Sequence, residues 1–179
     1  MKKFDELLEL ITDNRKRILF VGIGNVLRCD DGAGVYIVNG LMQSTNIVKI
    51  LVEVSLENYV STINKIKPDL LVLVDCINFG REPGYTGLLL PEETMETTVN
   101  THNLTLRRVS EFFDMPIFIL GIQPSCLEVG EEMTTAVKKS ADQIIWLLNH
   151  AICCQSALQN HIPFQTSRKH PNTYTYDNR

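Results

Sequence analysis

The sequence predicts an α/β fold: a twisted, mostly parallel sheet with one antiparallel or edge strand and helices on both faces, in three layers. Short apolar runs alternate with amphipathic stretches, and this alternation is typical of parallel strands joined by helices. The clearest predicted strand is Leu70–Val74, because consecutive apolar residues suit a strand that is buried on both faces.

The other elements follow from the spacing of apolar residues along the chain. Residues 4–11 have apolar positions at helical spacing, and the short run 87–90 suits an edge or antiparallel strand. The polar residues 92–103 are predicted to form a loop. Predicted strands cover residues 17–22, 47–54, 70–74, 87–90 and 116–121, and predicted helices cover 4–11, 35–42, 59–66, 104–113 and 131–148.

The length of 179 residues suits one domain. We assign residues 1–150 to a single α/β domain. The apolar spacing fades from Asn149 onward, so residues 151–179 are predicted to form a polar, flexible tail.

Composition narrows the choice of partners. The formal net charge is −4 without a basic block, which argues against nucleic acid and against an anionic membrane. No apolar run reaches the roughly 20 residues that a membrane span needs. The five cysteines are scattered without C-x-x-C spacing, which argues against a zinc ribbon or a redox motif. We therefore expect reduced thiols in a cytoplasmic protein.

Polar loops follow three of the predicted strands, at residues 22–34, 75–78 and 121–124. Ligands of open α/β sheets bind beyond the carboxyl ends of the strands, so these loops are expected to converge on one rim. A fourth polar stretch, Thr101-His-Asn103, precedes a predicted helix.

The first loop is rich in glycine but does not suit a dinucleotide. The fingerprint G-x-G-x-x-G requires glycine where this chain has Leu27. The adjacent carboxylates of Asp30 and Asp31 would also repel a phosphate. A nucleotide site is therefore disfavoured.

Carboxylates and a histidine in these loops indicate a metal site. Asp31, Asp75 and His102 would give two carboxylates and one imidazole, a set that suits a divalent transition metal with open positions. Simpler interpretations stay open at this point. One aspartate of the Asp30-Asp31 pair suits a helix cap, Asp75 suits a turn, and His102 suits a solvated loop.

Together these motifs resemble a known family, the hydrogenase maturation endopeptidases. The resemblance spans about Arg17 to Leu148 and is closest to the branch that serves formate-hydrogenlyase-type and methanogen hydrogenases. The motifs that carry it are Gly22-Ile-Gly-Asn25, Asp30-Asp31-Gly-Ala-Gly34, Val72-Leu-Val-Asp75-Cys, Pro83-Gly84, Thr101-His-Asn103 and Leu120-Gly-Ile-Gln-Pro124. One departure is Glu53-Val54-Ser55, where many members have Asp-Gly-Gly.

The resemblance implies an endopeptidase that removes a short C-terminal extension from the nickel-loaded large-subunit precursor of a nickel–iron hydrogenase. It implies that Asp31, Asp75 and His102 bind the nickel, which arrives with the substrate. Another divalent metal is an alternative in the isolated protein. The hydrogenase precursor would be the protein partner, and a monomer is the simplest expectation.

The sequence says less about which residues cleave the peptide bond than about which residues bind the metal. The motifs G-x-S-x-G and H-E-x-x-H are absent, so no nucleophile is identified. Asp31 and Asp75 are candidate catalytic carboxylates, and Asp30 is a possible base, in an aspartic-type or metal-assisted hydrolysis. We favour the metal as a recognition element. Cys29 is interpreted as a buried or half-buried thiol, because no histidine is adjacent to it.

Two other function classes are alternatives to the peptidase. A non-catalytic, nickel-dependent checkpoint or chaperone would share the fold and the ligands, and would bind the same precursor without shortening it. A small-nucleotide enzyme is disfavoured by the missing third glycine.

Overall fold

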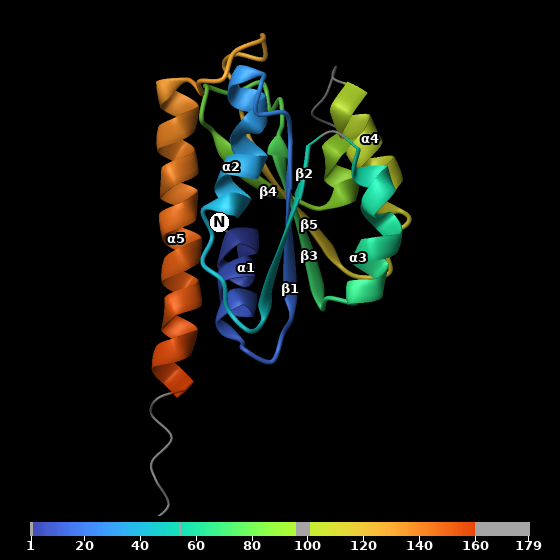
Figure 1. Ribbon diagram of the computed structural model, residues 1–179, viewed down its shortest axis with the longest axis vertical. Helices are drawn as coiled ribbons and strands as arrows, with labels where there is room; N and C mark the ends of the chain where they lie inside the picture. The colour runs from blue at the N-terminus through green and yellow to red at the C-terminus, as the bar shows by residue number, and fades with distance from the viewer. Residues whose placement is uncertain (1, 54, 96–100, 160–179) are drawn as a thin grey trace, which may run out of the picture.

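The computed structural model describes residues 2–53, 55–95 and 101–159, of which residues 2, 95, 101–105 and 155–159 are described in their backbone alone. The described residues form a five-stranded sheet with the order β2-β1-β3-β5-β4 (Figure 1). In chain order the elements are α1 (Lys2–Thr12), β1 (Ile18–Ile23), η1 (Cys29–Gly32), α2 (Ala33–Asn39), β2 (Ile47–Val52), η2 (Leu56–Tyr59), α3 (Val60–Ile66), β3 (Leu70–Cys76), β4 (Thr86–Leu89), η3 (Pro91–Met95), α4 (Thr101–Ser110), β5 (Ile117–Ile122) and α5 (Thr135–Gln159).

The pairing of the strands confirms the predicted fold class. Strand β1 pairs in parallel with β2 and β3, and β3 pairs in parallel with β5. Strand β4 pairs antiparallel with β5 at the edge of the sheet, where the sequence predicted an edge or antiparallel strand.

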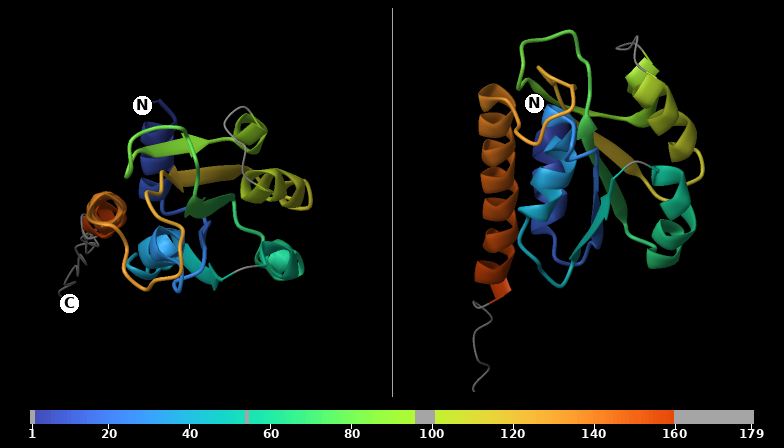
Figure 2. Two further views of the ribbon diagram at one scale, coloured as in Figure 1. Left: turned by 90° about the horizontal axis from the view of Figure 1, so that it is seen from above. Right: turned by 45° about the horizontal axis from the view of Figure 1, so that its top comes forward.

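Helices cover both faces of the sheet. Helices α1, α2 and α5 lie on one face and α3 and α4 on the other (Figure 2). Alternate residues of a strand face opposite sides, so Phe20 and Val72 pack under the first group while Leu19 and Leu71 pack under the second. This burial on both faces explains why β1, β3 and β5 are almost wholly apolar.

The last helix is longer than the sequence pattern predicted. We expected its end near Leu148, but α5 continues to Gln159 and crosses the proposed boundary at residue 150. Leu148, Ala151 and Ile152 are buried at helical spacing, in the core that α5 shares with α1. Small Ala151 carried too little hydrophobic signal to reveal this. Residues 160–179 of the predicted tail lie outside the described residues.

Two helices begin earlier than predicted. Helix α4 begins at Thr101, so Thr101-His-Asn103 is helical backbone and not loop. These residues precede the first apolar residue of the helix, and apolar spacing could not reveal them. Helix α2 begins at Ala33. Among the described helices, none is long and apolar enough to cross a membrane.

Glycines allow α2 to begin directly against the sheet. A Cβ on Gly34 would lie 2.2 Å from the carbonyl oxygen of Val74 and 2.3 Å from that of Ile23. Gly24 has a φ of +131°, and a Cβ there would lie 1.8 Å from the carbonyl oxygen of Asp31. The segment η1–α2 therefore rests on the carboxyl ends of β1 and β3. The strand order reverses between these two strands, which is where open α/β sheets bind ligands.

We expect Gly34→Ala to lower the free energy of unfolding by more than about 3 kcal/mol, because the new methyl group would meet two strand carbonyls that the sheet holds in place. Gly80→Ala is the control: its φ is positive, unlike that of Gly34, but a Cβ there meets nothing within 4 Å. Its cost should stay near 1–2 kcal/mol. Urea unfolding followed by circular dichroism measures both, and equal losses would contradict the close contact at Gly34.

Candidate functional site

The structure brings Asp31 and Asp75 together between β1 and β3. Asp75 lies near the carboxyl end of β3 and is only 4% exposed. Asp31 lies in η1, after β1, and is half-buried. The charge of Asp31 contributes to a raised pKa of Asp75, as expected for neighbouring carboxylates. The predicted convergence of these two loops is thus observed.

Asp75 is a buried carboxylate with few donors. Its pKa is raised to about 7, mainly by burial and further by the charge of Asp31, while a backbone hydrogen bond from Cys76 opposes the rise. That bond runs from the Cys76 N–H to Oδ1 of Asp75 over 2.8 Å. Within the described part of the chain, Oδ2 of Asp75 accepts no hydrogen bond. A buried carboxylate with so few donors is one that a cation would stabilise.

Asp31 has an accessible carboxylate. Its Oδ2 accepts a hydrogen bond of 3.1 Å from the backbone N–H of Asn25, which fixes the side chain beside the loop after β1. Its other oxygen accepts none from the described residues. Asp31 is therefore held in place and still has an oxygen available to a ligand.

Asp30 has the opposite environment, although it directly precedes Asp31 in the chain. It is fully buried, and its carboxylate accepts four hydrogen bonds. Oδ2 accepts from the N–H groups of Ser125 (2.8 Å) and Cys126 (2.9 Å) and from Oγ1 of Thr134 (3.0 Å), and Oδ1 accepts from the Thr134 N–H (2.7 Å). Asp30 thus ties η1 to the segment between β5 and α5. One aspartate of the pair binds backbone N–H groups while the other remains accessible. The interpretation of Asp30 or Asp31 as a cap of the helix that follows is wrong, because neither η1 nor α2 has a side-chain cap and the donors to Asp30 lie between β5 and α5.

Two residues outside the predicted set also hold the site. Thr134 supplies two of the donors to Asp30, and no pattern in the sequence marked it. Buried Gln123 accepts hydrogen bonds at Oε1 from the N–H groups of Phe79 (2.7 Å) and Arg81 (3.3 Å), which fixes the loop that follows β3. Gln123 lies in the Leu120–Pro124 motif, and that motif was its only signal.

The two cysteines nearest the aspartates are thiols with raised pKa values. Cys76 donates from Sγ to the carbonyl oxygen of Asp30 over 2.8 Å, and burial raises its pKa well above the usual value. Cys29 is half-buried, as predicted, and a hydrogen bond with Cys126 is the main cause that raises its pKa to about 11. Both thiols are therefore mostly protonated at neutral pH, which disfavours either as the nucleophile that attacks a peptide bond.

The third predicted ligand is only partly placed. His102 is the second residue of α4, but its side chain lies outside the described residues. The described part of the chain contains no group of three His, Cys, Asp or Glu side chains that could hold a metal. Two members of the predicted set lie close enough to interact electrostatically, and the position of the imidazole stays a prediction.

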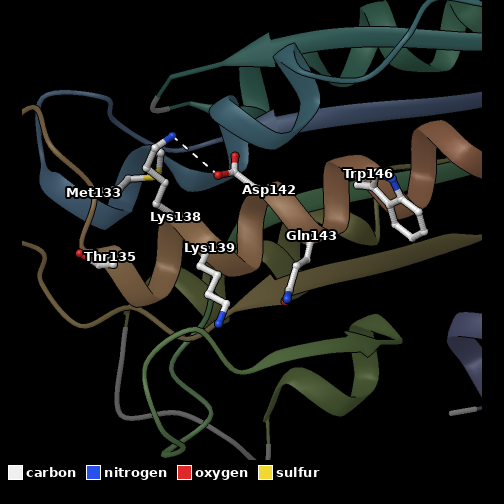
Figure 3. A pocket seen from close by; sticks show the side chains of 7 residues that line it. All are labelled: Met133, Thr135, Lys138, Lys139, Asp142, Gln143 and Trp146. Carbon is white, nitrogen blue, oxygen red and sulfur yellow. Dashed lines mark ion pairs between the residues drawn. The ribbon is translucent and has the colours of Figure 1, made fainter.

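Two hollows lined by described residues do not include these aspartates. One, of about 510 Å³, follows the outer face of α5, where Lys138 and Asp142 form an ion pair of 3.9 Å (Figure 3). A groove of about 950 Å³ lies along β4. Neither is lined by Asp31 or Asp75. The residues that line the first hollow are Met133, Thr135, Lys138, Lys139, Asp142, Gln143 and Trp146.

Solved structures define the class of fold. The crystal structure of a [NiFe] hydrogenase maturation protease HycI from Thermococcus kodakarensis is similar with a TM-score of 0.68 and 30% sequence identity, over 82% of this chain and 99% of that chain. The hydrogenase maturating endopeptidase HybD from Escherichia coli has the same fold, with a TM-score of 0.63 and 21% identity over 76% of this chain and 92% of that chain.

Sequence comparison then gives the family. The family model described as hydrogenase maturation protease matches residues 35–150. The hydrogenase 3 maturation protease of Escherichia coli strain K12 is 29% identical over 129 residues, which are 68% of this chain and 82% of that protein. The chain belongs to the hydrogenase maturation protease family, and it is a peptidase.

Asp30→Asn should lower the free energy of unfolding by about 2–4 kcal/mol, because an amide group would face N–H donors that the carboxylate now satisfies. Asp31→Asn is the matched control and should stay within about 1 kcal/mol of the native protein, because Asp31 accepts one hydrogen bond from the described residues. Urea unfolding at neutral pH separates the two. Similar losses would mean that Asp30 is not the structural member of the pair.

Asp75→Asn should stabilise the metal-free protein above neutral pH. Asp75 ionises near pH 3.8 in the unfolded chain and at about 7 in the fold. Its ionisation therefore weakens the fold progressively as pH rises between these values, and the loss is complete above them. Relative to the native protein, the variant should gain about 2–4 kcal/mol at pH ~8 and nothing below pH ~4. Unfolding in a chelator at both pH values measures this, and a pH-independent difference would contradict it.

Proposed function

We propose that this protein is an endopeptidase that removes a short C-terminal extension from the nickel-loaded large-subunit precursor of a nickel–iron hydrogenase. The observation that carries the proposal is the pair Asp31 and Asp75, adjacent at the point where the strand order reverses. The family, whose relatives are named for hydrogenase maturation, supplies the substrate class.

In this proposal the nickel belongs to the substrate. Asp31, Asp75 and His102 contribute the protein's ligands, and the precursor's own thiolates supply the rest. Asp75 is short of donors and lies beside a second carboxylate, so a bound cation removes an unfavourable interaction that the free protein retains. Coordination also requires that Asp75 lose its proton, which couples binding to deprotonation.

Such a site distinguishes a loaded precursor from an empty one. Two carboxylates and one imidazole leave coordination positions open, and a nickel that arrives with thiolates fills them. An empty precursor offers no cation to offset the charge of the pair. The nickel then positions the extension for cleavage, and positioning is a large part of peptide hydrolysis.

Among the aspartates, Asp31 is the better candidate for the general base. The oxygens of Asp30 are engaged by four donors, and the side chain is fully buried, so it cannot reach a water next to the peptide. Asp31 is half-buried and has an oxygen without a described partner. We therefore assign Asp30 to positioning the loop and Asp31 to the reaction. The protein would act as a monomer on this precursor.

The test is a processing assay with nickel-loaded and nickel-free precursor from the same source, read by intact mass. Loss of a C-terminal peptide from the loaded form alone is expected. Asp31→Asn should slow processing by about 100-fold or more, because a positioned base contributes at least that factor. In the Asp75→Asn and His102→Ala variants, the rate of processing of the nickel-loaded precursor should fall to the rate seen with the nickel-free precursor.

Asp142→Asn is the control for the loss of a carboxylate, because Asp142 is exposed on α5 and does not touch the pair. It should process normally. Full processing by Asp31→Asn would remove both roles assigned to that residue. Binding of the loaded precursor without any shortened product would support the checkpoint or chaperone function instead.

A further inference from the structure

Two cysteines meet beside the candidate site. Cys29 immediately precedes Asp30, and Cys126 lies in the segment between β5 and α5. The Asp30 N–H donates to the carbonyl oxygen of Cys126 over 3.1 Å, and the Cys126 N–H donates to Oδ2 of Asp30 over 2.9 Å. This reciprocal pair of hydrogen bonds brings the backbone at residue 29 against the backbone at residue 126.

The side chains of the two cysteines project from these two paired segments. The Cys29 N–H donates to the carbonyl oxygen of Gly130, and a Cβ on Gly130 would lie 2.9 Å from Sγ of Cys29. The Cys29 thiol is therefore enclosed by the turn formed by residues 126–130. Both thiols are half-buried, so a small reagent can reach them.

The backbone at Cys29 is fixed in an unusual conformation. Its φ is +42°, in the left-handed region that residues with a Cβ seldom adopt. Contacts on either side hold it there: Nη2 of Arg28 donates to the carbonyl oxygen of Leu127 over 2.9 Å, and the Gly130 N–H donates to that of Leu27 over 2.9 Å. The position of the Cys29 thiol is thus determined by its surroundings.

We propose that Cys29 and Cys126 are a modification site, at which an intramolecular disulfide forms by exchange with a small-molecule disulfide such as oxidised glutathione. One cysteine thiol loses its proton to water, and the resulting thiolate attacks the reagent, which gives a mixed disulfide and releases one glutathione thiolate. The second cysteine thiolate attacks the protein sulfur of that mixed disulfide, forms the Cys29–Cys126 bond and releases the second glutathione. The protein loses two protons and two electrons, and the reagent is reduced to two thiols.

The crosslink would join the turn that contains Asp31 to the segment that holds Asp30. That contact is otherwise maintained by the hydrogen bonds of the Asp30 carboxylate. Because the bond closes a loop of about 100 residues, it should stabilise the fold substantially. The inference goes beyond the proposed function, and its test needs no hydrogenase precursor.

The experiment uses the full chain with the exposed pair replaced, C153S/C154S, which leaves Cys29, Cys76 and Cys126. The protein is incubated with oxidised glutathione, and its mass and its thiols are read after denaturation. We expect the loss of two hydrogen atoms and one remaining thiol, which peptide mapping places at Cys76. The Tm should rise by several degrees, and dithiothreitol should reverse both changes.

The matched controls are Cys29→Ser and Cys126→Ser in the same background. Each should melt like the reduced parent, which shows that it folds, and should gain at most glutathione without losing two hydrogen atoms. The proposal is overturned if the parent stays reduced at every reagent concentration, if it stops at a mixed disulfide, or if the mapped bond contains Cys76.

Discussion

The direct contact between the start of α2 and the carboxyl ends of β1 and β3 determines the arrangement of the site. Gly34 has no Cβ, so the carbonyls of Val74 and Ile23 can lie against its backbone. A larger residue would lift α2 and move η1 away from β3. The separation of Asp31 and Asp75 therefore depends on the distance between the backbone of α2 and the backbone of the strands. Backbone atoms within a sheet move little, so this distance is well defined.

The three aspartates show two ways in which a fold accommodates a carboxylate. Asp30 is fully buried and has four donors, so its charge is compensated within the protein. Asp75 is equally enclosed but has one described donor and a like charge nearby, and its pKa rises accordingly. The Asp30 carboxylate has enough donors without a ligand, whereas a bound cation would stabilise the ionised form of Asp75. This difference supports the proposed roles, in which Asp30 holds the fold and Asp75 binds the cation.

Most of the fold was predictable, because buried strands leave a direct record in the sequence. The apolar runs located all five strands of the described sheet, and the position of polar residues after them located the rim where Asp31 and Asp75 meet. The different roles of Asp30 and Asp31 were not predictable, since adjacent residues share the same local sequence. Their partners decide the roles, and those of Asp30 come from Ser125 to Thr134. The full length of α5 was missed because, beyond Leu148, its buried stripe continues in small Ala151 and a single larger residue, Ile152.

The bonds that hold Asp30 join residues 95 to 104 positions apart in the chain. Contacts of such long sequence separation form late, since the intervening chain must be ordered first. During synthesis the turn that carries Asp31 emerges early, but its anchor follows only with the segment before α5. The N-terminal half of the chain alone therefore lacks the means to fix this turn, and an incomplete chain cannot present an assembled site to a precursor.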